Sequence, residues 1–488
     1  MSGALDGVRV VDLTTVLMGP FATQMLGDLG ADVIKVEPPA GDSSRMLGPQ
    51  RHAGMSASFL HTNRNKRSLV LDLKQPAAHA ALLKLVATAD VLVYNVRPQA
   101  MARLGLTFEA LSAVNPRLVY VGCFGYGQDG PYAAKPAYDD LIQGALGLPS
   151  LVAQVGDGVP RYVPIAMIDR TVCVATVSAV CAALYRREKT GVGQAVDVPM
   201  FETMVPFMLG EHLAGWTFEP PQGEPGYPRL LARDRKPFPT RDGYVCTLIY
   251  TDQHWRRFFE MIGRPDDFAR DPRLATFATR TTNIEAIYAM VADILRTRTT
   301  AEWLALFERA DIPAMPLNTL DSLVADPHLA ASGFFRLAEH PSEGAYRQMV
   351  PTPGWSESPP SLRRHAPRLG EHSAELLRDV MLRYDDAETP VFITETGWND
   401  HARWTKAVTP AQRVEYTLGG FAWADSNWPW LEELCLWVLR YPAPTYNYPD
   451  NFTLITPDFQ LKPIYYAVQG YARGFSDDEA LWPPASAE

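Results

Sequence analysis

The chain has 488 residues, of which 47% are hydrophobic, so it is long enough to form two or more domains with sizeable cores. Its net charge of −10 argues against general nucleic-acid binding. The five cysteines lack CxxC spacing and the ten histidines form no HxxxH or HExxH pair, which indicates neither a disulfide framework nor a metal site.

The first structural signal is a strand, helix, strand pattern near the start of the chain. The apolar run at 8–13 predicts a buried strand, Gly19-Pro20 predicts a turn into a helix, and 32–37 predicts a second strand. Such a unit implies a parallel sheet, and it places the turn at the carboxyl end of the first strand, where open α/β sheets bind ligands. This position indicates either a nucleotide or sugar-phosphate site or a purely structural turn. The usual dinucleotide fingerprint GxGxxG is absent from it.

The alternation of strands and helices continues. Strands are predicted at 67–72, 90–96 and 117–122, with helices such as 77–89 between them, which is typical of a doubly wound α/β fold. The longest strongly apolar helix, at 172–185, is too short to cross a bilayer, so we expect no membrane partner. Asp6 and Arg9 stand where a secretory signal needs apolar residues, so we expect a cytoplasmic protein.

A second body is predicted after a segment rich in proline and glycine at 204–237, which we interpret as a linker. A strand in DGYVCTLIY (242–250), helices at 253–263 and 282–296, and a strand in IPAMPL (312–317) follow it. They predict a smaller α/β domain.

The amino-acid sequence resembles one known family over residues 1–385. The matching segments keep one order and compatible spacing; after the opening they lie at 63–74, 89–106, 115–131, 137–143, 168–202, 310–335 and 367–377. They are similar to the class III CoA-transferases, the family of formyl-CoA transferase and carnitine CoA-transferase. The resemblance implies a large CoA-binding domain at 1–203, the linker at 204–237, a small domain at 238–330 and a return to the large domain at 331–385. It also implies a homodimer of two interlocked chains.

Asp169 is the predicted catalytic residue. From the residues alone, an Asp before the apolar helix is most simply an N-cap. The resemblance favours a nucleophile instead, because the family's catalytic aspartate precedes a helix ending in (R/K)xxTGxGQ, which reads REKTGVGQ at 187–194. It implies transfer of CoA from an acyl-CoA donor to a small carboxylic acid through an aspartyl anhydride and an aspartyl-CoA thioester. CoA then acts as a substrate, and no permanently bound cofactor or metal is required.

The resemblance also implies residues that contact CoA. They are Leu71, Asp72, Leu73, Lys74, Asn95, Val96, Arg97, Arg103, Tyr138 and Asp139. Guanidinium groups are suited to phosphate, although either arginine alone would more often be a solvated surface charge. A further basic cluster at 63–67 either faces phosphate or is merely exposed.

Departures from the family pattern limit the substrate. Leu17 and Met18 precede the Gly-Pro turn where formyl-CoA transferases carry a glutamine, so formate and oxalate are disfavoured and a dicarboxylate such as succinate or a longer acid is favoured. The alternative activity is that of an α-methylacyl-CoA racemase, which places a histidine base in a segment that reads Ala137-Tyr138-Asp139 here. A neutral tyrosine is a poor base near pH 7.

The resemblance ends near Tyr384, and 7 of the 11 tryptophans lie beyond residue 390. PVFITETGWND and the segments after it resemble the carboxyl-terminal end of a (β/α)8 glycoside hydrolase, with Glu395 at the nucleophile position. A barrel needs about 250 residues and a second carboxylic acid. We therefore interpret 386–488 as a partial glycosidase-barrel fragment, with glycoside hydrolysis or sugar binding as less favoured alternatives.

Overall fold

The computed structural model describes residues 3–352, 354–383, 391–396, 410–427, 431–436, 464, 465 and 468. It contains two compact units. The first comprises residues 1–50 and 54–373, and the second comprises 51–53 and 374–488.

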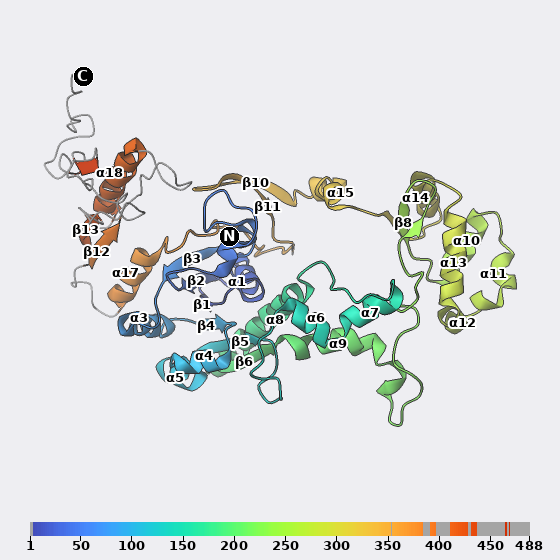
Figure 1. The fold of residues 1–488 in the computed structure, drawn as a ribbon, viewed down its shortest axis with the longest axis horizontal. Coiled ribbons are helices and arrows are strands. Elements are labelled where there is room, and N and C mark those ends of the chain that lie inside the picture. Colours follow the sequence, from blue (N-terminus) through green and yellow to red (C-terminus); the bar gives the residue numbers. More distant parts are fainter. Residues whose placement is uncertain are drawn as a thin grey trace, which may run out of the picture. The chain divides into compact units, whose positions relative to one another are not determined.

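The first unit is built on a six-stranded sheet whose strands all run parallel, in the order β3-β2-β1-β4-β5-β6. This order confirms the predicted doubly wound α/β fold (Figure 1). The strands are β1 (Arg9–Leu13), β2 (Asp32–Glu37), β3 (Lys66–Val70), β4 (Val91–Tyr94), β5 (Val119–Phe124) and β6 (Gln194–Pro199). The strand predicted at 67–72 ends earlier, because the Asp72 carboxylate accepts the Lys74 N–H and turns the chain.

Nine helices accompany this sheet in the described chain. They are α1 (Met18–Asp28), α2 (Ala57–Leu60), α3 (Pro76–Val86), α4 (Pro98–Arg103), α5 (Phe108–Val114), α6 (Asp139–Ala145), α7 (Leu148–Val155), α8 (Met167–Thr190) and α9 (Met200–His212). Short 3₁₀ turns lie at Ser43–Met46 and Ala214–Thr217. Neighbouring β1 residues Val10 and Val11 face opposite sides and are both fully buried, so both faces of the sheet are covered.

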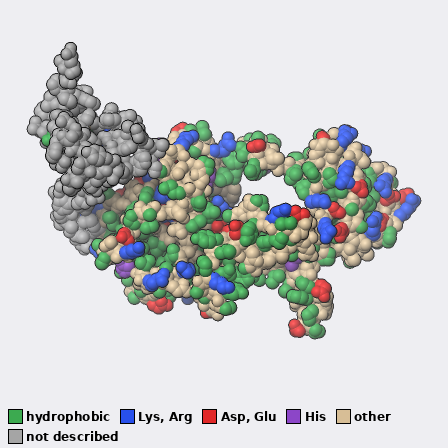
Figure 2. Space-filling view, viewed as in Figure 1, with side chains coloured by type: hydrophobic (Ala, Val, Ile, Leu, Met, Phe, Trp, Pro, Cys, Tyr) green, Lys and Arg blue, Asp and Glu red, His purple; other side chains and the backbone are tan. Residues whose placement is uncertain are grey.

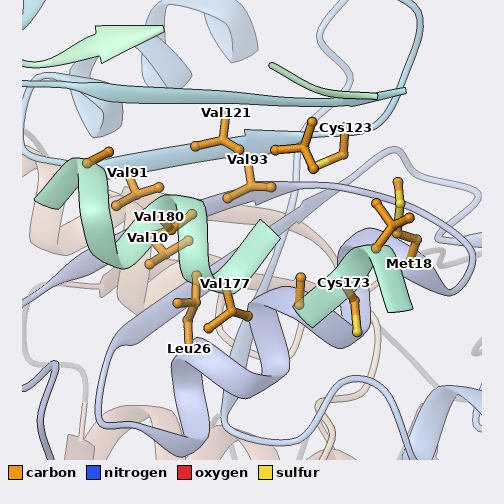
Figure 3. Close-up of a cluster of buried hydrophobic side chains, with 14 of the residues drawn as sticks. Val10, Met18, Leu26, Val91, Val93, Val121, Cys123, Cys173, Val177 and Val180 are labelled. Carbon is orange, nitrogen blue, oxygen red and sulfur yellow. The ribbon is translucent and has the colours of Figure 1, made fainter. Parts of the chain in front are cut away.

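The main core lies between the sheet and helices α1 and α8. Valines of β1, β4 and β5 contact apolar side chains of both helices, as strands buried on both faces require. Figure 3 shows this packing, with Val10, Val91, Val93 and Val121 of the sheet beside Leu26 of α1 and Val177 and Val180 of α8.

Helix α8 is longer than the sequence predicted. It begins at Met167 rather than 172 and ends at Thr190, where Gly191 adopts a left-handed φ of 74° that favours glycine. In length and apolar character it would therefore suit a membrane span, contrary to the expectation for 172–185. A core helix passes the same test, and α8 buries Val172, Val177 and Val180 in the sheet core.

The proposed linker at 204–237 is partly helical, because α9 continues to His212. A second body with its own core follows. It consists of an antiparallel sheet of β7 (Phe238–Pro239), β8 (Tyr244–Thr247) and β9 (Ala314–Pro316) with helices α10 (Asp252–Met261), α11 (Asp267–Arg270), α12 (Phe277–Thr282), α13 (Ile284–Leu295) and α14 (Thr300–Arg309), plus a 3₁₀ turn at Pro272–Leu274. The predicted strands and helices of this body are all present, and its boundaries at 238 and 330 stay a prediction.

The chain then continues through α15 (Leu320–Val324), α16 (Pro327–Ala331) and an antiparallel hairpin of β10 (Phe335–His340) and β11 (Gly344–Met349). Residues 361–373 contact the large sheet domain again, since Ser361 N–H donates to the carbonyl of Asp28 and His372 N–H to that of Ser68.

On the face drawn in Figure 2, hydrophobic side chains lie exposed among charged ones over much of the described surface.

The second unit contains α17 (Ser373–Arg383) apart from its first residue, and a strand, helix, strand element. Strands β12 (Val391–Thr396) and β13 (Leu431–Leu436) pair in parallel, and α18 (Pro410–Asn427) connects them in sequence. Glu395 belongs to β12. Its side chain and most of 386–488 lie outside the described residues, so the glycosidase-fragment interpretation stays a prediction.

Candidate active site

A pocket of about 420 Å³ lies where β1, β4 and β5 end. Its walls come from residues 15–18 in the β1–α1 connection and at the start of α1, the β4–α4 turn (95–98), the end of β5 (123–125) and the loop before α6 (135–138). Asp169 and Met200, from the first turns of α8 and α9, complete it. The pocket therefore occupies the carboxyl edge of the parallel sheet, where the sequence predicted a ligand site.

Asp169 is the third residue of α8, and Ala166 is the N-cap. The alternative interpretation of Asp169 as the N-cap is therefore wrong, because the helix begins two residues before it. Its backbone N–H donates to the Asp139 carboxylate over 2.9 Å. Asp139 thus satisfies an amide of the first turn that has no partner within the helix.

Burial of the Asp169 carboxyl and repulsion from Asp139 together raise its pKa from 3.8 to about 6, against the opposing attraction of Arg170. The side chain of Gln143 fixes the Asp139 carboxylate, because Gln143 Nε2 donates to Asp139 Oδ1 over 2.5 Å. Gln143 Oε1 in turn accepts the Val163 N–H over 2.9 Å. The site therefore holds two carboxyl groups together. Asp139 faces a helix amide, and Asp169 lines the pocket.

The structure brings four of the predicted CoA residues to the pocket that contains Asp169. These are Asn95, Val96, Arg97 and Tyr138. Tyr138 is 66% exposed, and Arg97 is exposed at the start of α4. The other six lie elsewhere: Leu71, Asp72, Leu73 and Lys74 follow β3, Arg103 ends α4, and Asp139 lies behind Asp169.

The side-chain amide of Asn95 bonds to the backbone of Thr15, and the CoA contact that the resemblance implied for Asn95 stays a prediction. Its Oδ1 accepts the Thr15 N–H over 2.9 Å, and its Nδ2 donates to the Thr15 carbonyl over 2.7 Å. Both hydrogen bonds link the β4–α4 turn to the β1–α1 connection. Asn95 therefore fixes one wall of the pocket to another.

Sequence reasoning did not select several residues that line the pocket. Cys123 and Met200 stand in apolar runs, which indicate a core rather than a pocket, and Lys135 lies in a loop without a regular pattern. The Lys135 ammonium lies over the Tyr132 ring at 3.9 Å from its centroid. Cys123 is no competing nucleophile, because burial raises the pKa of its thiol to about 12.

The basic cluster at 63–67 is neither exposed nor turned to phosphate. Arg64 pairs with Asp28 at 2.7 Å, Lys66 with Asp12 at 2.9 Å, and Arg67 with Asp32. Lys66 is fully buried. Both interpretations of this cluster were therefore wrong, because an acidic partner from the β1–α1–β2 unit meets each cation. Within the described residues, no group of three or more His, Cys, Asp or Glu side chains could hold a metal ion.

The chain is similar in sequence and in structure to known proteins. A family model described as CoA-transferase family III matches residues 5–373. The succinate–glutarate CoA-transferase of Agrobacterium fabrum is 34% identical over 384 residues, which are 77% of this chain and 95% of the relative. The acetyl-CoA:oxalate CoA-transferase of Acetobacter aceti is 35% identical over 389 residues, 77% of this chain and 96% of the relative. A crystal structure of a CAIB/BAIF family protein from Brucella suis superposes with a TM-score of 0.66 at 30% identity, covering 78% of this chain and all of the other.

Proposed function

Because the chain belongs to CoA-transferase family III, we propose that it moves CoA from an acyl-CoA donor to a carboxylic acid with Asp169 as the nucleophile. The observation that carries this proposal is the place of Asp169. Its carboxyl group belongs to a pocket at the carboxyl edge of the sheet, together with Arg97 and Tyr138.

The proposed reaction consists of four acyl transfers. An Asp169 oxygen attacks the thioester carbonyl of the donor, the C–S bond breaks, and CoA leaves as the thiolate with a mixed anhydride left on the enzyme. The thiolate attacks the aspartyl carbonyl of the anhydride, which forms an aspartyl-CoA thioester and releases the donor acid as a carboxylate. The acceptor carboxylate then repeats both steps in reverse order. Asp169 and the proton count are restored.

The electrostatics of Asp169 support this role. At pH 7 a carboxyl group with a pKa of about 6 is about nine-tenths ionised, and it is more basic than an ordinary aspartate. A more basic carboxylate is a stronger nucleophile towards a thioester. Leu17 and Met18, at the start of α1, belong to the same pocket and carry backbone amides suited to a developing oxyanion.

We propose that Arg97 and Arg103 contact the phosphates of CoA. Neither guanidinium has an ion-pair partner among the described residues, and Arg97 lies on the pocket. Lys74 and Lys135 are further exposed cations near strand and loop ends. Forked hydrogen bonds from arginine are suited to phosphate oxygens.

We further propose that two chains assemble as a homodimer. Large apolar side chains remain exposed on α8 and α9, including Tyr185 at 68% and Phe207 at 63%. Exposed apolar side chains of this size are typical of surfaces that contact another protein. For the substrates, the names of the relatives favour a short acyl-CoA donor and a dicarboxylic acid acceptor such as glutarate.

A panel of acyl-CoA donors and carboxylic acids tests the proposal. We expect new acyl-CoA products, with succinyl-CoA and glutarate as the first pair. Asp169→Ala should abolish transfer while CoA still binds in calorimetry. Exchange of the α-proton of a 2-methylacyl-CoA in heavy water, without transfer, would support the racemase activity instead. Full transfer by Asp169→Ala would exclude the proposed nucleophile.

A further inference from the structure

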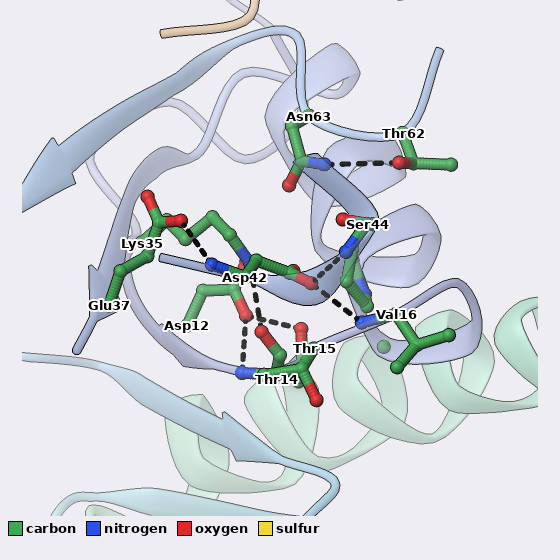
Figure 4. Close-up of polar contacts among 12 residues, drawn as sticks. Asp12, Thr14, Thr15, Val16, Lys35, Glu37, Asp42, Ser44, Thr62 and Asn63 are labelled. Carbon is green, nitrogen blue, oxygen red and sulfur yellow. Dashed lines mark hydrogen bonds and ion pairs between the residues drawn. The ribbon is translucent and has the colours of Figure 1, made fainter. Parts of the chain in front are cut away.

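The β1–α1 connection at residues 14–16 is held by side chains rather than by backbone pairing. Asp12 accepts the Thr14 N–H, Lys35 donates to the Thr14 carbonyl over 2.8 Å, and Asp42 accepts the Val16 N–H over 3.1 Å. Asn95 bonds both backbone groups of Thr15. Five of the six backbone polar groups of residues 14–16 therefore have side-chain partners. Figure 4 shows Thr14 and Val16 beside Asp12, Lys35 and Asp42.

Three of these partners are charged and almost completely buried. Asp12 and Lys35 are 0% exposed and Asp42 is 2% exposed. Lys35 also pairs with Asp42 at 2.8 Å, and Asp42 accepts the Ser44 N–H as well. Burying several ions in one place is costly, and the paired geometry offsets that cost only when each ion keeps its partners. The connection is thus tied to a rigid network.

Val16 is the strained residue of this connection. It adopts a φ of 71°, in the left-handed region that a β-branched side chain rarely enters. Such strain persists only where surrounding bonds maintain it, and it clusters at functional sites. The Asp42 carboxylate supplies the bond that holds the Val16 N–H.

We propose that Asp12, Lys35, Asp42 and Asn95 form a loop clamp that positions the pocket wall at 15–18 against Asp169. Residues 15–18 line the pocket, and Phe21, one turn along α1, has the Arg170 guanidinium over its ring at 4.3 Å. The clamp therefore acts next to the predicted nucleophile. Asp42 and Asn95 are positioning residues, and this role rests on the proposed CoA transfer.

The clamp predicts a specific kinetic signature. If it sets the approach of the thioester to Asp169, loosening it lowers kcat, because a displacement of about 1 Å can cost about a hundredfold in rate. The affinity for CoA should change little, because the phosphates are expected at Arg97 and Arg103 rather than at the connection.

Asp42→Asn is the first variant. Normalised to folded protein, kcat should fall about tenfold to a hundredfold while the Kd for CoA stays within about threefold. Val16→Gly in the same background should restore part of kcat, because glycine adopts a positive φ without a clamp. The matched control is Asp28→Asn, which also removes a buried ion pair but has no bond to residues 14–16. Equal kcat losses in Asp42→Asn and Asp28→Asn, or no rescue by glycine, would overturn the clamp.

Asn95→Ser keeps the test decisive if Asp42→Asn does not fold. The clamp predicts lower kcat with unchanged CoA affinity, whereas weaker CoA binding with unchanged kcat would make Asn95 a direct CoA contact and refute its positioning role. Hydrogen exchange of the peptide covering residues 14–17 should speed up at least tenfold in the clamp variants and not in Asp28→Asn. Exchange needs no turnover, so it decides the clamp even if the unaltered protein transfers no CoA and the proposed function fails.

Discussion

At the scale of single residues, Asp169 illustrates how position sets reactivity. A helix N-terminus alone would lower the pKa of a carboxylate, but burial of the Asp169 carboxyl raises its pKa, and repulsion from Asp139, which bonds to the same helix terminus, adds to that effect. The net effect is a raised pKa for Asp169. Asp139 accepts the Asp169 N–H, so it orders the start of α8. The same residue also raises the pKa of the Asp169 carboxyl group.

The raised pKa of Asp169 predicts the acidic limb of the pH profile. The nucleophilic carboxylate is lost as pH falls through about 6, so kcat/KM at pH 5 should be about tenfold below its plateau. Asp139→Asn removes the neighbouring negative charge and keeps an acceptor for the Asp169 N–H, so the limb should move to lower pH. A profile that Asp139→Asn leaves in place, measured with a saturating acceptor, would contradict this origin of the shift.

The two arginines of the β4–α4 region make a second residue-scale prediction. Charge-assisted bonds to phosphate are worth about 1.5–3 kcal/mol, so Arg97→Ala and Arg103→Ala should each weaken CoA binding about tenfold to a hundredfold. Arg186→Ala, an exposed arginine on α8, is the control and should bind CoA normally. Unchanged affinity in calorimetry would remove that arginine from the CoA site.

At the scale of elements, the period of the apolar residues and the turn signals located strands β1 to β5 of the large sheet to within a few residues, and no range was predicted for β6. The same reasoning placed Asp169 at a helix start and missed that α8 begins at Met167. Helix starts without a side-chain cap leave little trace in sequence, and Ala166 provides none. The residues of the pocket wall were predicted only where a resemblance named them.

The sequence did not show which side chains meet across neighbouring strands of the sheet. The cluster at 63–67 reads as basic, and only the sheet order places β3 beside β2 and brings Lys66 to Asp12 of β1. Asn95 likewise reads as a polar strand end. Its bonds to Thr15 span 80 positions in sequence and depend on β1 lying beside β4.

The buried pair of Lys66 and Asp12 predicts a large effect on stability. Lys66→Met leaves Asp12 without its closest cation, which should cost about 3–5 kcal/mol in the free energy of unfolding. Asp12→Asn in the same background should recover part of this loss, because it removes the uncompensated charge. Denaturant unfolding of the four proteins measures the coupling, and strictly additive changes would show that the pair does not act as a unit.

At the scale of the whole molecule, the family match and the compact units agree on one boundary. The match ends at residue 373, and apart from 51–53 the second unit begins at Ala374. All residues of the candidate site belong to the first unit. From the sequence, the end of the family resemblance and the composition shift predict a boundary near residue 385, which stays a prediction.

This division predicts the behaviour of a truncated protein. A chain ending at Tyr384 should keep full CoA transfer and be at least as soluble as the whole chain, because it loses 7 of the 11 tryptophans, a residue type that promotes association wherever it is exposed. Glu395→Gln should leave transfer unchanged, and the full chain should not hydrolyse aryl glycosides. Loss of transfer on truncation, measured at equal concentrations of folded protein, would mean that residues beyond 384 complete the fold or the assembly.

The covalent role of Asp169 is tested by trapping the enzyme-bound intermediate. The protein is incubated with an acyl-CoA donor, treated with hydroxylamine, digested and analysed by mass spectrometry. An aspartyl-CoA thioester predicts a hydroxamate on Asp169 that depends on the donor and is absent in Asp169→Ala. A protein that transfers CoA while Asp169 stays unmodified, or that carries the hydroxamate on another residue, would contradict the account.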